Sequence, residues 1–176
     1  MVLDDIDESY PHDLPVEQVP VHIAKAKAKA YEQVIHDDQL VITADTVVVL
    51  GNLVLGKPKN RQEAIDMLKA LSNQTHRVIT GVCLTTIKQQ RTLSVVSEVS
   101  FKQMTDEEIT YYVDKYQPYD KAGAYGIQEW IGYVGVTALN GSYFNVMGLP
   151  VQRIYQELVE MCGFDGLIRG DKALLC

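Results

Sequence analysis

The sequence lacks the features that would assign it to several special classes of protein. Its 176 residues hold three cysteines, an odd number without CxxC spacing, and four histidines without an HxxxH pair. We therefore expect neither a disulfide framework nor a structural zinc site, and the cysteine usage indicates a reducing, cytoplasmic setting. No apolar run approaches the roughly 20 residues that span a bilayer. The acidic start after Met1 is unlike a signal peptide.

Basic residues are also scarce. The chain has 16 lysines and arginines against 23 acidic residues, which gives a net charge of -7. A protein that binds duplex nucleic acid usually presents a basic face, so we expect no such partner. A phosphorylated small molecule needs only a few local cations and stays compatible with this charge. With 47% hydrophobic and 22% charged residues, the composition is that of an ordinary globular protein of one domain or two small lobes.

Strand and helix patterns alternate along the chain. Helical patterns cover residues 21–35, two segments that follow capping residues at Asn60 and Thr105, and residues 149–161. Each capping residue has a glutamate three positions on, Glu63 and Glu108, which predicts two capping boxes. Strand patterns cover residues 40–50, 53–55, 75–87, 92–101 and 130–139. This order predicts an α/β or α+β fold with a mixed sheet.

Two charged residues stand out in the first half of the chain. Asp45 interrupts an apolar strand pattern, and a buried carboxylate needs a partner or a metal; otherwise Asp45 simply faces solvent at a strand end. Lys57 lies between Gly56 and Pro58, where a stiff loop aims a cation at an anionic substrate or forms an ordinary surface loop. In the Ala-Lys alternation over residues 24–30, we expect two of the three lysines to be solvated.

Two further segments are candidates for ligand binding. Residues 120–128 are small and glycine-rich, which lets a ligand approach the backbone. Gln128 can read a nucleobase edge, because its amide both donates and accepts; the alternative is a structural turn. At the N-terminus, four clustered carboxylates suit a hard divalent cation or form a solvated loop. These carboxylates are Asp4, Asp5, Asp7 and Glu8.

Taken together and in order, these pieces closely resemble one known family. The motifs that carry the resemblance are Asp-Glu-Ser (7–9), Ala-Lys-Ala (26–28), Thr-Ala-Asp-Thr-Val-Val (43–48), Gly-Lys-Pro (56–58), Leu-Ser-Asn-Gln-Thr-His (71–76), Thr-Gly-Val (80–82), Asp-Lys-Ala-Gly-Ala-Tyr-Gly-Ile-Gln (120–128) and Gly-Ser-Tyr-Phe-Asn-Val-Met-Gly-Leu-Pro (141–150). They resemble the Maf family of nucleoside triphosphate pyrophosphatases. The match predicts one such domain over residues 1–162 and leaves residues 163–176 as a tail.

The resemblance implies a fold and an activity. Maf proteins have an elongated mixed sheet flanked by helices, with two lobes around a cleft, similar to inosine triphosphate pyrophosphatases. They cleave between the α- and β-phosphates, need Mg²⁺ or Mn²⁺, and often dimerise, so a homodimer is one expectation. The Gly-Ile-Gln ending of the 120–128 loop resembles the branch that acts on dTTP and UTP, and modified pyrimidine nucleotides are further candidate substrates. Two alternatives stay open: a purine-selective pyrophosphatase, and a catalytically impaired module that binds nucleotide or a partner in cell division.

The same resemblance implies roles for individual residues. Asp45 matches the family's proton acceptor and, with Glu8, a metal ligand. The remaining candidates are substrate-binding or specificity positions. They are Thr46, Gln128, Lys27, Lys57 and Lys121.

One departure from the family is clear. Its members begin with a strand and a Ser-Xaa-Ser-Pro-Arg-Arg stretch, some 20–30 residues before the Asp-Glu-Ser match, and this sequence holds no Ser-Pro-Arg-Arg. We therefore expect a chain that is truncated at its N-terminus, weakly active or inactive, and prone to aggregate, because a lost strand exposes a sheet edge.

Overall fold

The computed structural model describes residues 6–32, 35–37 and 39–169, with the side chains of residues 165–169 left out of the description. The described helices are α1 (Val19–Tyr31), α2 (Arg61–Leu71), α3 (Asp106–Tyr116), η1 (Ala122–Ala124), α4 (Trp130–Gly135), α5 (Tyr143–Val146) and α6 (Val151–Arg169). The described strands are β1 (Val41–Leu50), β2 (Leu53–Leu55), β3 (Thr75–Thr85), β4 (Gln90–Phe101) and β5 (Val136–Asn140). None of the helices in the described part of the chain is long and apolar enough to cross a membrane.

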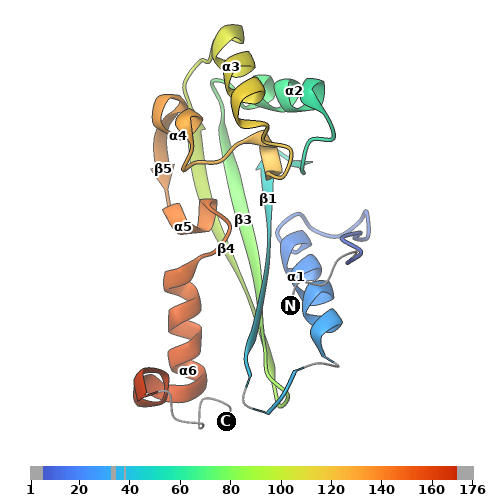
Figure 1. The fold of residues 1–176 in the computed structure, drawn as a ribbon, viewed down its shortest axis with the longest axis vertical. Helices are drawn as coiled ribbons and strands as arrows, with labels where there is room; N and C mark the ends of the chain where they lie inside the picture. The colour runs from blue at the N-terminus through green and yellow to red at the C-terminus, as the bar shows by residue number, and fades with distance from the viewer. Residues whose placement is uncertain (1–5, 33–34, 38, 170–176) are drawn as a thin grey trace. The chain divides into compact units, whose positions relative to one another are not determined.

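The described strands form one sheet in the order β2-β1-β3-β4-β5 (Figure 1). The mixed α/β class expected from the sequence is confirmed, and within it the sheet is antiparallel rather than mixed in strand direction. The short connection between β1 and β2 explains why these two strands are antiparallel. Gly51 and Asn52 join them as a tight hairpin in which Leu50 pairs with Leu53. At the other edge, Val99 of β4 pairs with Leu139 of β5.

The chain divides into two compact units, in agreement with the two expected lobes. The first comprises Met1–Asp45, Thr80–Val95 and Leu149–Cys176, and the second comprises Thr46–Ile79 and Val96–Gly148. The strands β1, β3 and β4 each contribute residues to both units.

In the first unit, two helices cover opposite faces of β3. Cys83 packs with Ala24 and Ala28 of α1, whereas Val82 and Leu84 pack with Ile154 of α6. This division follows from the alternation of side chains along a strand. The small residues let α1 approach closely: a Cβ at Gly81 would lie 2.3 Å from the backbone of Pro20.

In the second unit, the core lies between the sheet and helices α2, α3 and α4. It contains Val78 and Val99 from the strands, Leu68 from α2, Tyr112 from α3 and Ile131 from α4. The expected capping box at the start of α3 is confirmed, since Thr105 and Glu108 exchange hydrogen bonds. Gln117, at φ +46, ends α3 one residue before Pro118.

Two local predictions are wrong. The segment 130–139 was expected to be strand throughout, but Trp130–Gly135 is helix α4 and β5 begins only at Val136. Ile131 and Gly135 are both buried and lie one helical turn apart, so core packing overrides the strand preference of the aromatic and branched residues. At α2, Asn60 caps the helix as expected, but the Glu63 carboxylate accepts from the Lys59 N–H instead of completing a capping box.

Candidate functional site

Asp45 lies within β1 and forms an ion pair with Lys27 of α1. The Lys27 Nζ donates to Asp45 Oδ1 at 2.7 Å and lies 2.8 Å from Glu8 Oε1. The Asp45 side chain is only 11% exposed and that of Lys27 is 21% exposed. The alternative in which Asp45 merely faces solvent is therefore wrong. Three residues far apart in the sequence meet here in a single charge cluster, Glu8–Lys27–Asp45.

The electrostatics of this cluster favour a charged lysine. Burial alone lowers the pKa of Lys27, but the hydrogen bonds and negative charges of Asp45 and Glu8 outweigh it, and the pKa ends above its ordinary value. Lys25 and Lys29, the other two lysines of the Ala-Lys alternation, are exposed, as expected. The helical period explains the difference, because it turns only one lysine of the three toward β1.

The geometry also bears on the predicted metal ligands. The carboxylates of Glu8 and Asp45 converge on one cationic group, the Lys27 ammonium. Such a pair of oxygen ligands is of the kind a hard divalent cation prefers, so the donor set fits Mg²⁺ or Mn²⁺. Asp7 points elsewhere, since its carboxylate accepts from the backbone and side chain of Ser9. Asp4 and Asp5 lie outside the described residues, and among the described residues no group of three or more acidic, histidine or cysteine side chains is placed to hold a metal.

In the second unit, the loop of Lys57 is tied to the glycine-rich loop. The Gly123 N–H donates to the Gly56 carbonyl at 3.0 Å, and Lys57 itself is exposed. The pKa of the Asp120 carboxyl lies below its usual value, mainly because Lys121 donates to it, and the charge of Lys57 adds to this effect. Two segments that the sequence singled out separately, 56–58 and 120–128, are thus neighbours.

Unusual backbone conformations hold the glycine-rich loop in place. Gly123 has φ +66, and a Cβ there would lie 2.9 Å from a Val48 methyl group. Ala124 has φ +59, a conformation that non-glycine residues rarely adopt, and is fully buried. Such local strain concentrates at functional sites. The combination of strain and burial is compatible both with a ligand-binding loop and with a structural turn, so the role of this loop stays a prediction.

Gln128, the predicted base reader, is exposed and lies in a turn whose ends are both bonded to Tyr112. The Tyr112 hydroxyl accepts from the Gly126 N–H at 3.0 Å and donates to the Glu129 carboxylate. Glu129 also lies 3.4 Å from the Nζ of Lys121. Lys121 is therefore held among Asp120 and Glu129, and its pKa is raised because these carboxylates outweigh the effect of its burial.

A buried histidine, His76, contacts the glycine-rich loop from the core of the second unit. His76 is 1% exposed, its Nε2 lies 2.8 Å from the Tyr125 hydroxyl, and its ring contacts Phe101 edge-on. Burial lowers the pKa of His76 to about 4, so this side chain is neutral at pH 7.

Thr46 follows Asp45 directly in β1 and begins the second unit. A Cβ at Gly148, at the end of the 141–150 motif, would lie 3.5 Å from the Thr46 hydroxyl. The same motif is anchored by Asn145, whose side-chain amide donates to Val78 O at 3.1 Å and Ser97 Oγ at 3.0 Å. The motif thus ends beside a predicted specificity position.

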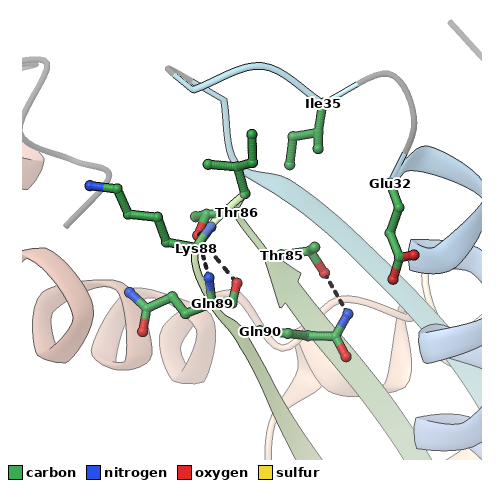
Figure 2. Close-up of a pocket in the computed structure, with 8 residues that line it drawn as sticks. Glu32, Ile35, Thr85, Thr86, Lys88, Gln89 and Gln90 are labelled. Atoms are coloured by element: carbon green, nitrogen blue, oxygen red, sulfur yellow. Dashed lines mark hydrogen bonds between the residues drawn. The ribbon is translucent and has the colours of Figure 1, made fainter.

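A pocket of about 380 Å³ lies elsewhere in the first unit, at the turn between β3 and β4 (Figure 2). Gln90 donates to Thr85 Oγ1 on its wall, and Glu32 and Lys88 also line it. None of the predicted site residues is among the described residues that line it. This pocket is therefore not part of the candidate site.

Comparison with known proteins agrees with the resemblance read from the motifs. Residues 1–161 match the family described as "Maf: Maf-like protein". The chain belongs to the Maf family. It is 59% identical over 157 residues to a dTTP/UTP pyrophosphatase of Parabacteroides distasonis, which covers 89% of this chain and 81% of that protein. A protein of the same name from Phocaeicola vulgatus is 57% identical with the same coverage, and one from Flavobacterium johnsoniae is 46% identical, over 90% of this chain and 82% of that protein.

Sequence reasoning missed the residues that support the site. Neither Tyr112, on the apolar side of α3, nor Glu129, which precedes α4, was singled out. The available signal was a hydroxyl on an otherwise apolar helix face, because a buried tyrosine usually needs a hydrogen-bond partner.

Proposed function

We propose that the chain hydrolyses dTTP and UTP to the monophosphate and pyrophosphate. The observation that carries the proposal is the Glu8–Lys27–Asp45 cluster, in which a mostly buried carboxylate is held by a lysine at 2.7 Å. The names and high identity of the relatives support the choice of substrate. Asp45 is the proposed proton acceptor for the attacking water. The water oxygen bonds to the α-phosphorus, its proton passes to Asp45, and the electron pair of the broken P–O bond leaves with pyrophosphate.

Lysines supply the positive charge that a triphosphate requires. We propose that Lys27 and Lys57 hold the β- and γ-phosphates, since ammonium groups neutralise phosphate charge. Lys27 is bound to both carboxylates in the described structure. If Glu8 and Asp45 held a cation, the Lys27 ammonium would be able to turn toward phosphate. Lys121, beside Asp120 and Glu129, is a further proposed contact to substrate.

The proposed cofactor is Mg²⁺ or Mn²⁺, with Glu8 and Asp45 as its protein ligands. When bound, such a cation would neutralise phosphate charge and lower the pKa of a bound water. If Asp45 also binds the cation, its role shifts from proton acceptor toward orienting the water.

Nucleobase recognition is assigned to the second unit. We propose that Gln128 bonds the edge of the pyrimidine, because its amide is exposed and carries both a donor and an acceptor. Thr46, beside Gly148, is the second proposed specificity position.

The test is pyrophosphate release from dTTP and UTP with Mg²⁺ or Mn²⁺, compared between the wild type and Asp45→Asn. We expect the variant to lose about 100-fold or more in kcat, because loss of a proton acceptor typically costs that much. The control is Asp66→Asn on the exposed side of α2, where the carboxylate accepts only from Gln62 among the bonds described.

Two results would contradict the proposal. If Asp45→Asn hydrolysed the substrates at the wild-type rate, Asp45 would not be the proton acceptor. If the wild type released no pyrophosphate with either cation, the proposed activity would be wrong. Activity of the 176-residue chain itself stays a prediction that the same assay measures. A cytoplasmic location, a homodimer and lack of binding to duplex nucleic acid also stay predictions; light scattering and a gel-shift assay test the last two.

A further inference from the structure

One hydroxyl group holds both ends of the turn that carries Gln128. The turn covers residues 126–129, and its own backbone bond runs from the Glu129 N–H to the Gly126 carbonyl at 3.0 Å. The Tyr112 hydroxyl accepts the Gly126 N–H at 3.0 Å and donates to the Glu129 carboxylate. A phenol on α3 therefore fixes the first and last residues of the turn at the same time.

The rest of the turn leaves one side chain for a ligand. Ile127 is buried in the core of the second unit, whereas Gln128 is exposed. A Cβ at Gly126 would lie 2.9 Å from the Glu129 carboxyl carbon and 3.0 Å from Lys121 Cε, so a side chain there would displace the ends of these two side chains. The direction of Gln128 consequently depends on how the two ends of the turn are held.

Packing alone does not require a tyrosine at this position. The Tyr112 ring is 0% exposed and stacks on Tyr116, which a phenylalanine ring would do equally well. Burial and the bond to Glu129 raise the pKa of the Tyr112 hydroxyl, so it is protonated and able to donate at neutral pH. Burying a hydroxyl is costly unless it forms hydrogen bonds, and both of these bonds go to the Gln128 turn.

We propose that Tyr112 and Glu129 are positioning residues for nucleobase selectivity. They hold the 126–129 turn so that the Gln128 amide meets the edge of a pyrimidine, and neither touches the reacting phosphates. This inference rests on the proposed function and deepens it, because it assigns the selectivity of the site to a buried hydrogen-bond pair outside the substrate contacts.

The experiment compares Tyr112→Phe with Tyr111→Phe in the full chain. Both changes remove a phenol from α3, but the Tyr111 hydroxyl accepts from Lys115 on the exposed side of the helix. For Tyr112→Phe we expect the KM for dTTP and UTP to rise about tenfold and the preference over dATP to fall by a similar factor, because the loss affects base binding. We expect kcat to change less than twofold, and Tyr111→Phe to match the wild type in all three quantities.

A second pair of variants tests the carboxylate. Glu129→Gln keeps an oxygen that can accept from Tyr112, whereas Glu129→Ala does not. The proposal expects the selectivity of Glu129→Gln to stay near the wild-type value and that of Glu129→Ala to fall to the level of Tyr112→Phe. Denaturant unfolding of each variant separates a loss of selectivity from a loss of fold.

The outcomes distinguish this inference from the proposed function. If the wild type prefers pyrimidines and Tyr112→Phe keeps the same KM and preference, the positioning role is overturned and the activity stands. If Tyr112→Phe lowers kcat and raises KM by the same factors for all nucleotides, the role in selectivity is also overturned. If the wild type hydrolyses neither dTTP nor UTP, the proposed function fails and the inference fails with it.

Discussion

The Glu8–Lys27–Asp45 cluster and the 120–128 loop are built on different physical principles. The cluster is held by ion pairs between partly exposed side chains, two of which come from α1 and β1 and one from the N-terminal segment. The loop is held by buried hydrogen bonds, two consecutive residues with positive φ, and close contact with Val48. One region depends on charges that can exchange partners, and the other depends on a fixed backbone.

The difference matches what each region is proposed to bind. A triphosphate with its cation arrives and leaves as a cluster of charges, so groups that contact it gain from being able to re-pair. A nucleobase is distinguished by a few directed hydrogen bonds, and discrimination depends on polar groups held in fixed positions. We therefore expect substitutions in the loop to cost folding stability, and substitutions in the cluster to cost mainly activity.

The largest effect on stability is expected for Gly123→Ala. The change puts a Cβ at a residue with φ +66 and 2.9 Å from a Val48 methyl group, so backbone strain and overpacking add. We expect a loss of about 3–4 kcal/mol in the free energy of unfolding, measured by urea denaturation. Gly51→Ala is the matched control, because its φ of +61 is similar but nothing lies within 4 Å of the new Cβ; it should cost only about 1 kcal/mol. Equal losses in the two variants would show that contact with Val48 contributes nothing.

A smaller effect should appear as a pH dependence of stability from His76. Its pKa in the folded state is about 4, against 6.5 for an ordinary histidine. The unfolded chain therefore binds a proton between these values that the folded chain does not, and stability rises with pH over this range and is flat below it. As the pH falls from above 6.5 to below 4, this effect lowers the free energy of unfolding by roughly 3 kcal/mol.

The measurement for His76 is the free energy of unfolding from pH 4 to pH 7 in the wild type and in His76→Gln. We expect the variant to show a smaller slope between pH 4 and 6.5. His12, His22 and His36 are exposed and supply the control, since they remain in the variant. The same slope in both proteins would contradict the prediction.

The smallest effect on stability is expected in the charge cluster, for Lys27→Met. The change leaves two carboxylates without their shared cation, but Glu8 is 41% exposed and solvent compensates part of the loss. We expect a cost of about 1–2 kcal/mol at pH 7, measured by urea denaturation.

Two measurements test whether the Lys27 ion pairs stabilise the fold. Because the pKa of Lys27 is raised in the fold, its stabilising contribution is present below the ordinary value of 10.5 and is lost as the pH rises through the higher folded value. In an Asp45→Asn background, Lys27→Met should cost less than it does alone, because the paired residues are coupled. Additive costs would mean that the ion pair contributes nothing to stability.

Short-range patterns account for much of what could be predicted. The capping box of Thr105 and Glu108 was predictable because it depends on residues three positions apart. Asn60 was recognised as a cap for the same reason, but the partner of Glu63 was not, because Lys59 competes for its carboxylate. Helix α4 was missed because Ile131 and Gly135 are selected by the core rather than by local preference.

The sequence by itself determined the family, the order of most helices and strands, and the residue types of the candidate site. Motifs and periodicity are properties of the chain, so they can be read without coordinates. Only the tertiary structure decided that Lys27 pairs with both Glu8 and Asp45, that segments 56–58 and 120–128 are neighbours, and that Tyr112 holds the turn of Gln128. Each of these contacts joins residues more than a dozen positions apart, and such pairs are fixed by the packing of helices on the sheet rather than by local sequence.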